Sequence, residues 1–102
     1  MFKLTPDPTF KAEVEIPRPG ASAGRIKFEF SYKDADELSD YMNRLADLGD
    51  IDGIMEIVTG WSGVDVPFNR DNLELLVKKY NGAAMRIFKK YTDELTKARS
   101  GN

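Results

Sequence analysis

The 102-residue sequence contains no cysteine and no histidine. Their absence excludes a thiol nucleophile, a histidine general base, a structural zinc site and a c-type haem site. No stretch approaches the roughly 20 consecutive apolar residues that span a bilayer, and the first eight residues lack the apolar core of a signal peptide. We therefore expect a cytoplasmic protein without a membrane segment.

The composition is that of an ordinary globular domain. Hydrophobic residues make up 41% of the chain and charged residues 31%, with a formal net charge of −2. A chain of this length can bury a core without disulfide or metal staples, so we predict one domain over residues 1–102. The slightly acidic balance argues against a generic nucleic-acid binder.

Residues 9–32 have the pattern of a β-hairpin. Apolar and polar residues alternate from Phe10 to Ile16, and again from Ile26 to Tyr32. The proline- and glycine-rich stretch 17–24 between them is typical of a turn. Because two strands alone are marginally stable in water, we expect their apolar face to pack on the helices that follow.

The rest of the chain is predicted to be helical. Asp34 and Glu37 have the spacing of a capping box, and Gly49 ends the apolar periodicity that follows them. Phe68 and Leu73 flank Asn69 like a hydrophobic staple around an N-cap. The predicted fold class is α+β, a two-stranded antiparallel hairpin packed on a mainly α-helical domain. Its four expected helices cover about residues 34–48, 50–60, 70–80 and 82–98.

The apolar faces of these elements define a predicted core. Its members are Val14, Phe28, Phe30, Leu45, Ile54, Val58, Leu76 and Phe88. The second helix is expected to end in a glycine turn that holds Trp61, the only tryptophan.

Three motifs in the second half of the chain resemble one protein family. They read E-I-V-x-G-W-x-G-V-D-V-P-F from Glu56, N-x-x-N-L-x-x-L-V-x-x-Y from Asn69, and G-A-A-x-x-I-F-x-x-Y-x-x-E-L from Gly82. Together with the hairpin and its F-K-L-x-P-x-P-T-F lead-in, they resemble the tail assembly chaperones of long-tailed (siphovirus-type) bacteriophages over nearly the whole chain. Asn81 departs from the family, where proline is expected in many relatives.

The resemblance implies a non-enzymatic function without cofactors. Such a protein binds the tape measure protein and keeps that long helical chain soluble while tail-tube subunits polymerise around it. A longer frameshifted form often accompanies the short one and would be the route of contact with the tail-tube protein. The implied place of action is the host bacterial cytoplasm, and the protein is not expected in the mature virion.

Trp61 is the first candidate for binding the partner, because tryptophan is enriched among the residues that dominate interface energies. We expect a helix-in-groove contact with exposed apolar residues around it and tyrosines at the rim. The candidates are Trp61, Val64, Val66, Tyr80 and Tyr91. The alternative is that Trp61 belongs to the core, where a lone tryptophan at a helix end beside Val58 and Phe68 is more often found.

Charge is unevenly distributed along the chain. The first two predicted helices are mainly acidic and the last two mainly basic, which favours head-to-tail contacts in a cyclic or helical homo-oligomer. The open edges of the hairpin also offer contact sites to a neighbour. The candidates for self-association are Asp36, Asp40, Arg86, Lys89 and Lys90. The alternative is that these charges compensate one another within a monomer.

Two other functions compete with a chaperone. A small nucleic-acid-binding regulator could use the basic C-terminal helices, although no groove-reading motif accompanies them. A hydrolase could use Asp50, Asp52 and Glu56 as acid, base or cation ligands, but without histidine this hypothesis is weak. Helix capping and the helix dipole explain these three carboxylates more simply, and no metal site is predicted.

Overall fold

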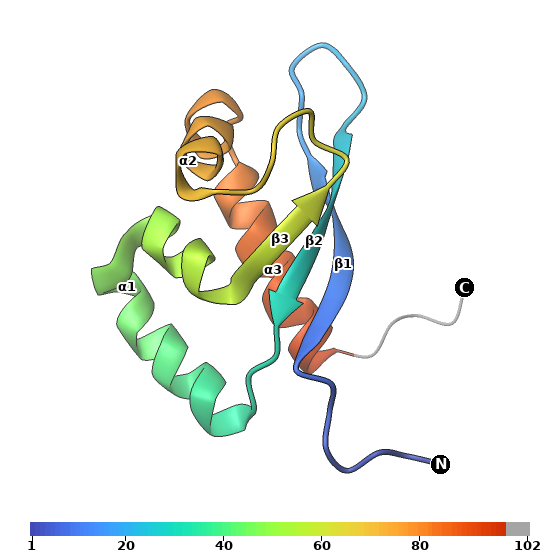
Figure 1. Cartoon of the computed structure of the whole chain (residues 1–102). Coiled ribbons are helices and arrows are strands. Elements are labelled where there is room, and N and C mark those ends of the chain that lie inside the picture. The colour runs from blue at the N-terminus through green and yellow to red at the C-terminus, as the bar shows by residue number, and fades with distance from the viewer. Residues whose placement is uncertain (98–102) are drawn as a thin grey trace.

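A computed structural model of the chain describes residues 1–97 and has an α+β fold (Figure 1). Over these residues one antiparallel sheet of order β1-β2-β3 packs against three helices. The elements are β1 (Thr9–Ile16), β2 (Gly24–Ser31), α1 (Ala35–Ile57), β3 (Val58–Ser62), α2 (Arg70–Lys79) and α3 (Ala83–Thr96). The predicted fold class is thus confirmed, whereas the number of strands and helices differs.

The predicted hairpin is present. β1 and β2 pair from Thr9↔Ser31 to Ile16↔Gly24, in a register that places the apolar residues of both strands on one face. Alternate residues of both strands are buried, as the period of two requires. The opposite face carries charged residues, so only one face is available to the helices.

The third strand corrects the prediction for residues 50–60. β3 begins at Val58, where a helix was expected to continue, and Trp61 lies on this strand instead of in a helix-ending turn. Trp61 pairs with Phe28 and Val58 pairs with Phe30, with an irregularity between them. The helix prediction holds through Ile57 and was wrong for residues 58–60, because a short apolar run fits either structure and the free edge of β2 supplies backbone partners that local periodicity does not reveal.

α1 joins the two helices predicted on either side of Gly49. Gly49 has φ 80° and ψ 175°, a non-helical conformation that kinks the helix at the predicted break. The Tyr41 hydroxyl donates a 2.6 Å hydrogen bond to the carbonyl oxygen of Gly53, which ties the first half of α1 to the second. The capping box of Asp34 and Glu37 is confirmed at the N-terminus of the helix.

α2 and α3 begin at the predicted signals. The Asn69 side chain caps α2 by accepting a hydrogen bond from the backbone N–H of Asn72. Gly82 precedes α3 with φ 85°, a left-handed conformation that favours glycine and separates the two helices. α3 ends at Thr96, and residue 98 of the predicted helix lies outside the described residues.

The core lies between the apolar face of the sheet and the helices. Five predicted core residues are buried, namely Val14, Phe28, Phe30, Ile54 and Val58. The other three, Leu45, Leu76 and Phe88, are only partly buried and pack against this core. Aromatic rings connect the layers, since Tyr91 of α3 lies 5.3 Å from Phe30 and 6.2 Å from Tyr41 between ring centroids.

Candidate partner-binding surface

An apolar hollow lies between α2 and the loop that leaves β3. Its volume is about 350 Å³, and we call it the α2 groove. The groove is lined by Trp61, Val64, Asp65, Val66, Asn72, Leu75, Leu76, Lys79 and Tyr80. A second hollow shares Val64, Asp65, Leu76 and Tyr80 and reaches the end of the sheet at Ile16 and Gly24. The apolar surface therefore continues from α2 to one end of the sheet.

Trp61 is held in place on one side of the groove. Its ring meets Phe28 and Phe68 edge-on, with centroid distances of 6.1 Å and 5.2 Å. The indole N–H donates a 2.9 Å hydrogen bond to the carbonyl oxygen of Val66, which closes the loop over the ring. Because its polar atom already has a partner and the side chain is only half buried, Trp61 both packs on the core and presents apolar surface.

A hydrogen bond also fixes the other side of the groove. The Asn72 amide donates a 2.8 Å hydrogen bond to the carbonyl oxygen of Pro67, which fixes the loop to the first turn of α2. Val66, Leu75 and Tyr80 are large apolar residues that stay exposed on this surface, with 47% of Leu75 accessible. Side chains held on a rigid scaffold lose little conformational entropy when a partner binds.

Two charges lie at the rim of the groove, Asp65 and Lys79. Both residues are exposed, and neither has an ion-pair partner within residues 1–97. A charged residue of each sign at the edge of an apolar surface can orient a partner without adding a buried charge.

The groove brings together four of the five residues predicted to bind a partner. Trp61, Val64, Val66 and Tyr80 line it, although they come from β3, the following loop and the end of α2. The sequence prediction missed Leu75. Its signal was a leucine out of phase with the inward stripe of Leu73 and Leu76, which marks an apolar residue on the outer face of α2.

Tyr91 is the exception among the predicted binding residues. Its side chain is buried in the core, and its hydroxyl donates a 2.8 Å hydrogen bond to the carbonyl oxygen of Ser31. Burial raises the pKa of the Tyr91 hydroxyl, so it stays neutral. Tyr91 follows Ile87 by four residues and belongs to the inward face of α3, so it cannot form the rim of a surface site.

The residues predicted for self-association lie on two elements. Asp36 and Asp40 are on the first half of α1, whereas Arg86, Lys89 and Lys90 line a hollow of about 340 Å³ beside β1. Several of these charges have partners on their own helices. The ion pairs are Asp40–Arg44 at 2.8 Å, Lys89–Asp93 at 2.7 Å and Lys90–Glu94 at 3.6 Å. Such exposed pairs are weak and leave the side chains free to exchange partners.

Of the three carboxylates considered for catalysis, Asp50 is exposed, and Asp52 and Glu56 are engaged in separate ion pairs. Asp52 accepts a hydrogen bond from Arg70 at 2.6 Å, and Glu56 lies 2.8 Å from Arg44 and 2.9 Å from Lys33. Hydrogen bonds from Arg44 and then Lys33 lower the pKa of Glu56 to about 2, against the effect of its partial burial. Glu56 therefore stays ionised near neutral pH and cannot act there as a general acid. Within residues 1–97 no three acidic, histidine or cysteine residues form a group that could hold a metal ion.

Among the described helices none is long and apolar enough to cross a bilayer.

Comparisons with known proteins give one match. No curated protein and no solved structure matches the chain. A family model described as phage tail assembly chaperone matches residues 1–102.

Proposed function

Because the chain belongs to the phage tail assembly chaperone family, we propose that it binds the tape measure protein and keeps it soluble while tail-tube subunits polymerise around it. The observation that carries this proposal is the α2 groove, an apolar hollow with Trp61 at its side and the exposed Val66 and Leu75 in its lining. Exposed apolar patches of this kind mark protein–protein, membrane or ligand-binding sites.

The apolar side chains that line the groove suit one face of an amphipathic helix. A helix presents apolar side chains at positions i, i+3, i+4 and i+7, and two or three of them can insert between Trp61, Val64 and Leu75. Asp65 and Lys79 at the rim would pair with charges beside the apolar stripe and set the direction of the helix. A long helical partner with an apolar stripe aggregates unless that stripe is covered, which is what such a groove provides.

The proposed place of action follows from the same function. The chaperone would act in the host bacterial cytoplasm during assembly and would be absent from the mature virion. A frameshifted longer form would add contact with the tail-tube protein. One groove makes a small contact, so several copies along one tape measure chain would bind mainly through avidity.

Capture of the tape measure protein tests this proposal. The chain is co-expressed with the tape measure protein of the same phage, and the soluble and co-purified amounts of that protein are measured. We expect Leu75→Glu to reduce the captured amount about tenfold, because it places a charge in the apolar contact. The matched control is Met85→Glu, which changes a 74% exposed apolar residue of α3 outside the groove lining.

Both variants should keep the melting temperature of the wild type, because each changes an exposed side chain. If wild-type chain retains no tape measure protein at low salt, the proposed function is wrong. If the two variants lose binding equally, the function stands but the groove is not its site.

A further inference from the structure

The α2 groove continues into the second hollow, at the end of the hairpin. This hollow has a volume of about 350 Å³ and shares Val64, Asp65, Leu76 and Tyr80 with the groove. Figure 1 shows the loop between β1 and β2 at the same end of the molecule as α2 and the loop after β3. Because the two hollows share one wall, neighbouring side chains of a single apolar stripe can fill both of them.

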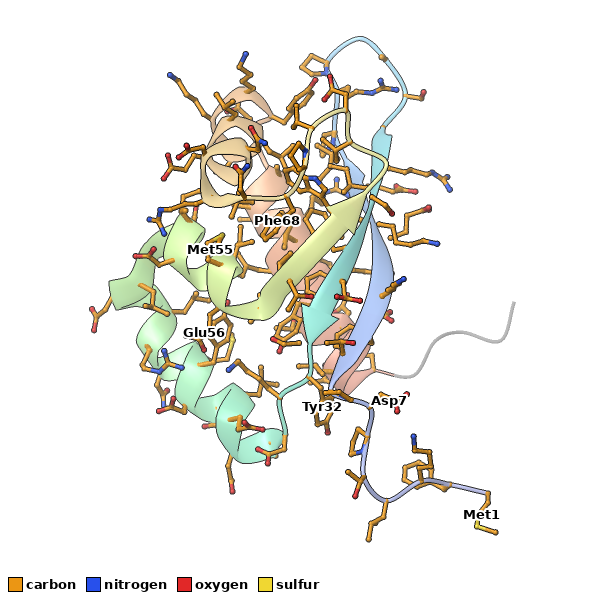
Figure 2. The ribbon with its side chains drawn as sticks, viewed as in Figure 1. Met1, Asp7, Tyr32, Met55, Glu56 and Phe68 are labelled. Atoms are coloured by element: carbon orange, nitrogen blue, oxygen red, sulfur yellow. The ribbon has the colours of Figure 1, made fainter. Side chains whose placement is uncertain are left out.

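The apolar surface beneath the two hollows belongs to the folded core. Trp61 packs on Phe68 with 5.2 Å between ring centroids, and Figure 2 shows Phe68 in the interior between α2 and β3. Ile16 of β1 and Ile26 of β2 are buried residues that line the second hollow. A partner therefore meets a preformed surface, and little conformational entropy of this chain is lost when it binds.

Arg18 lines the second hollow on the side away from α2, and its side chain is held in place. Its Nε–H donates a 2.8 Å hydrogen bond to the carbonyl oxygen of Ser22, within the loop between β1 and β2. Its Cδ atom lies over Gly24, 3.5 Å from the position that a Cβ of that residue would take. The guanidinium is thus fixed at the edge of an apolar surface.

The charge of Arg18 has no partner within residues 1–97. Its two terminal nitrogens make no hydrogen bond or ion pair there. Arg25 lines the same hollow but is engaged, since it lies 3.2 Å from Glu13 and 3.5 Å from Glu15. The free charge at the hairpin end of this surface is therefore positive.

We propose that the α2 groove recognises an amphipathic helix of the tape measure protein whose apolar stripe is flanked by carboxylates, and that Arg18 binds one of them. This inference rests on the proposed function and adds the chemistry of the bound segment. The terminal nitrogens of a guanidinium bind both oxygens of a carboxylate in parallel, which fixes orientation as well as affinity.

The other charges of the surface agree with carboxylates at the ends of the stripe. Lys79 is exposed at the end of α2 and favours a second carboxylate there. Asp65 lines both hollows and repels a carboxylate between the two ends. The surface therefore selects against acidic residues within the stripe and in favour of acidic residues on either side of it.

Trp61 permits a direct test, because it is the only tryptophan and lies in the groove. The probes are three synthetic helical peptides without tryptophan that share one leucine stripe at positions i, i+3, i+4 and i+7. The two residues before the stripe and the two after it are all glutamate, all glutamine or all lysine. From the change in Trp61 emission at low salt, we expect the glutamate peptide to bind about fivefold more tightly than the glutamine peptide, and the lysine peptide to bind most weakly.

The preference for glutamate must depend on Arg18. In Arg18→Gln it should fall to about twofold or less, whereas the matched control Arg86→Gln, which removes the same charge from α3 outside the groove lining, should keep it. Equal affinities of the glutamate and glutamine peptides for the wild type would overturn the inference. So would equal losses in the two variants, or no response to any peptide at up to about 1 mM.

Capture of the tape measure protein distinguishes this inference from the proposed function. Arg18→Gln should capture about fivefold less of that protein than the wild type, at an unchanged melting temperature because Arg18 is exposed. If the wild type captures the tape measure protein but the peptides show no preference for glutamate, only the inference about the bound segment fails. If the glutamate peptide is preferred but the wild type captures no tape measure protein, the proposed function fails and the preference of the groove for acidic helices stands.

Discussion

At the scale of single residues, glycine at position 49 decides how α1 folds back on itself. Gly49 has φ 80° and ψ 175°, a region of backbone conformation that is nearly restricted to glycine. Alanine in the middle of an ordinary helix would be about 1 kcal/mol more favourable than glycine. At this kink we expect alanine to be less favourable than glycine. Holding alanine in the strained backbone conformation costs more free energy than its higher helix propensity gains.

We therefore expect Gly49→Ala to lower the free energy of unfolding by about 1–3 kcal/mol in chemical denaturation. The matched control is Gly60→Ala in β3, because an added Cβ there meets nothing within 4 Å and the residue has no positive φ. That control should change stability by less than about 1 kcal/mol. A Gly49→Ala protein more stable than wild type would mean that the kink is not required.

Glu56 links three parts of the fold. It accepts two hydrogen bonds from Arg44, at 2.8 and 2.9 Å, and lies 2.9 Å from the Lys33 ammonium, so it joins both halves of α1 to the segment after β2. These partners hold its pKa at about 2, below the ordinary value of 4.5. A lowered carboxyl pKa stabilises the fold above the unfolded-state pKa, and the stabilisation is lost as pH falls toward the folded-state value.

We expect the unfolding free energy of the wild type to fall between about pH 5 and pH 2, with about 1–3 kcal/mol of that loss due to Glu56 after allowance for solvent screening. Glu56→Gln should be less stable at pH 7 and should lose that part of the pH dependence. Asp47→Asn is the control, because Asp47 is exposed and has no ion pair within residues 1–97. Equal pH profiles for Glu56→Gln and wild type would contradict the linkage.

At the scale of elements, the parts of the fold that depend on local sequence were predicted correctly. The capping box at Asp34, the cap at Asn69 and the break at Gly49 all depend on residues within one turn of each other. β3 could not be predicted in the same way, since Val58 and Trp61 adopt a strand only because β2 presents an edge some 30 residues earlier.

The candidate groove shows the same division. The resemblance and the enrichment of tryptophan in interfaces pointed to Trp61, Val64, Val66 and Tyr80, and the fold brings these four together. The prediction of Tyr91 as a surface residue was wrong, because the periodicity of α3 places its ring in the core even though its hydroxyl is polar. The phase of Leu75 against Leu73 and Leu76 placed it on the outer face of α2, but which outer residues line a groove depends on where the loop after β3 lies, which a single sequence leaves open.

The strand assignment of β3 can be tested by a pair of neighbouring substitutions. Val58 is buried against the core and Thr59, the next residue, is exposed. We expect Val58→Asp to unfold the protein, because an unpaired buried charge costs several kcal/mol against a total stability of about 5–15 kcal/mol. Thr59→Lys places its charge beside the Glu29 carboxylate, which accepts a 2.7 Å hydrogen bond from the Thr59 hydroxyl, and should shift the unfolding free energy by less than about 1 kcal/mol.

Circular dichroism melting measures both effects. A helix through this segment would place residues 58 and 59 about 100° apart on its surface, so both positions could face the core in part. In a strand they lie on opposite faces, and the two substitutions must differ sharply. Similar melting temperatures for the two variants would contradict the strand and the core position of Val58.

At the scale of the whole molecule, the charge distribution favours head-to-tail contacts between copies. Figure 1 shows the start of α1 at one end of the molecule, and α2 with the start of α3 toward the other. Asp36 and Asp40 lie near the first end, whereas Arg86 lies in the first turns of α3 near the second. A head-to-tail neighbour would bring acidic and basic residues together.

This arrangement predicts that self-association depends on salt. Charge pairing should weaken when salt shortens the Debye length from about 30 Å at 0.01 M to about 8 Å near physiological ionic strength. We therefore expect Lys89→Glu with Lys90→Glu to weaken the oligomer mainly at low salt.

Sedimentation velocity over a range of concentrations measures these effects. The control for the charge reversal is Lys11→Glu with Lys27→Glu, which makes the same change in net charge on the exposed face of the sheet. If that control weakens the oligomer as much as the α3 variant does, net charge and not a specific contact controls assembly. A single monomeric species at low salt and high concentration in the wild type would contradict the predicted charge pairing, because such a contact should produce a concentration-dependent oligomer.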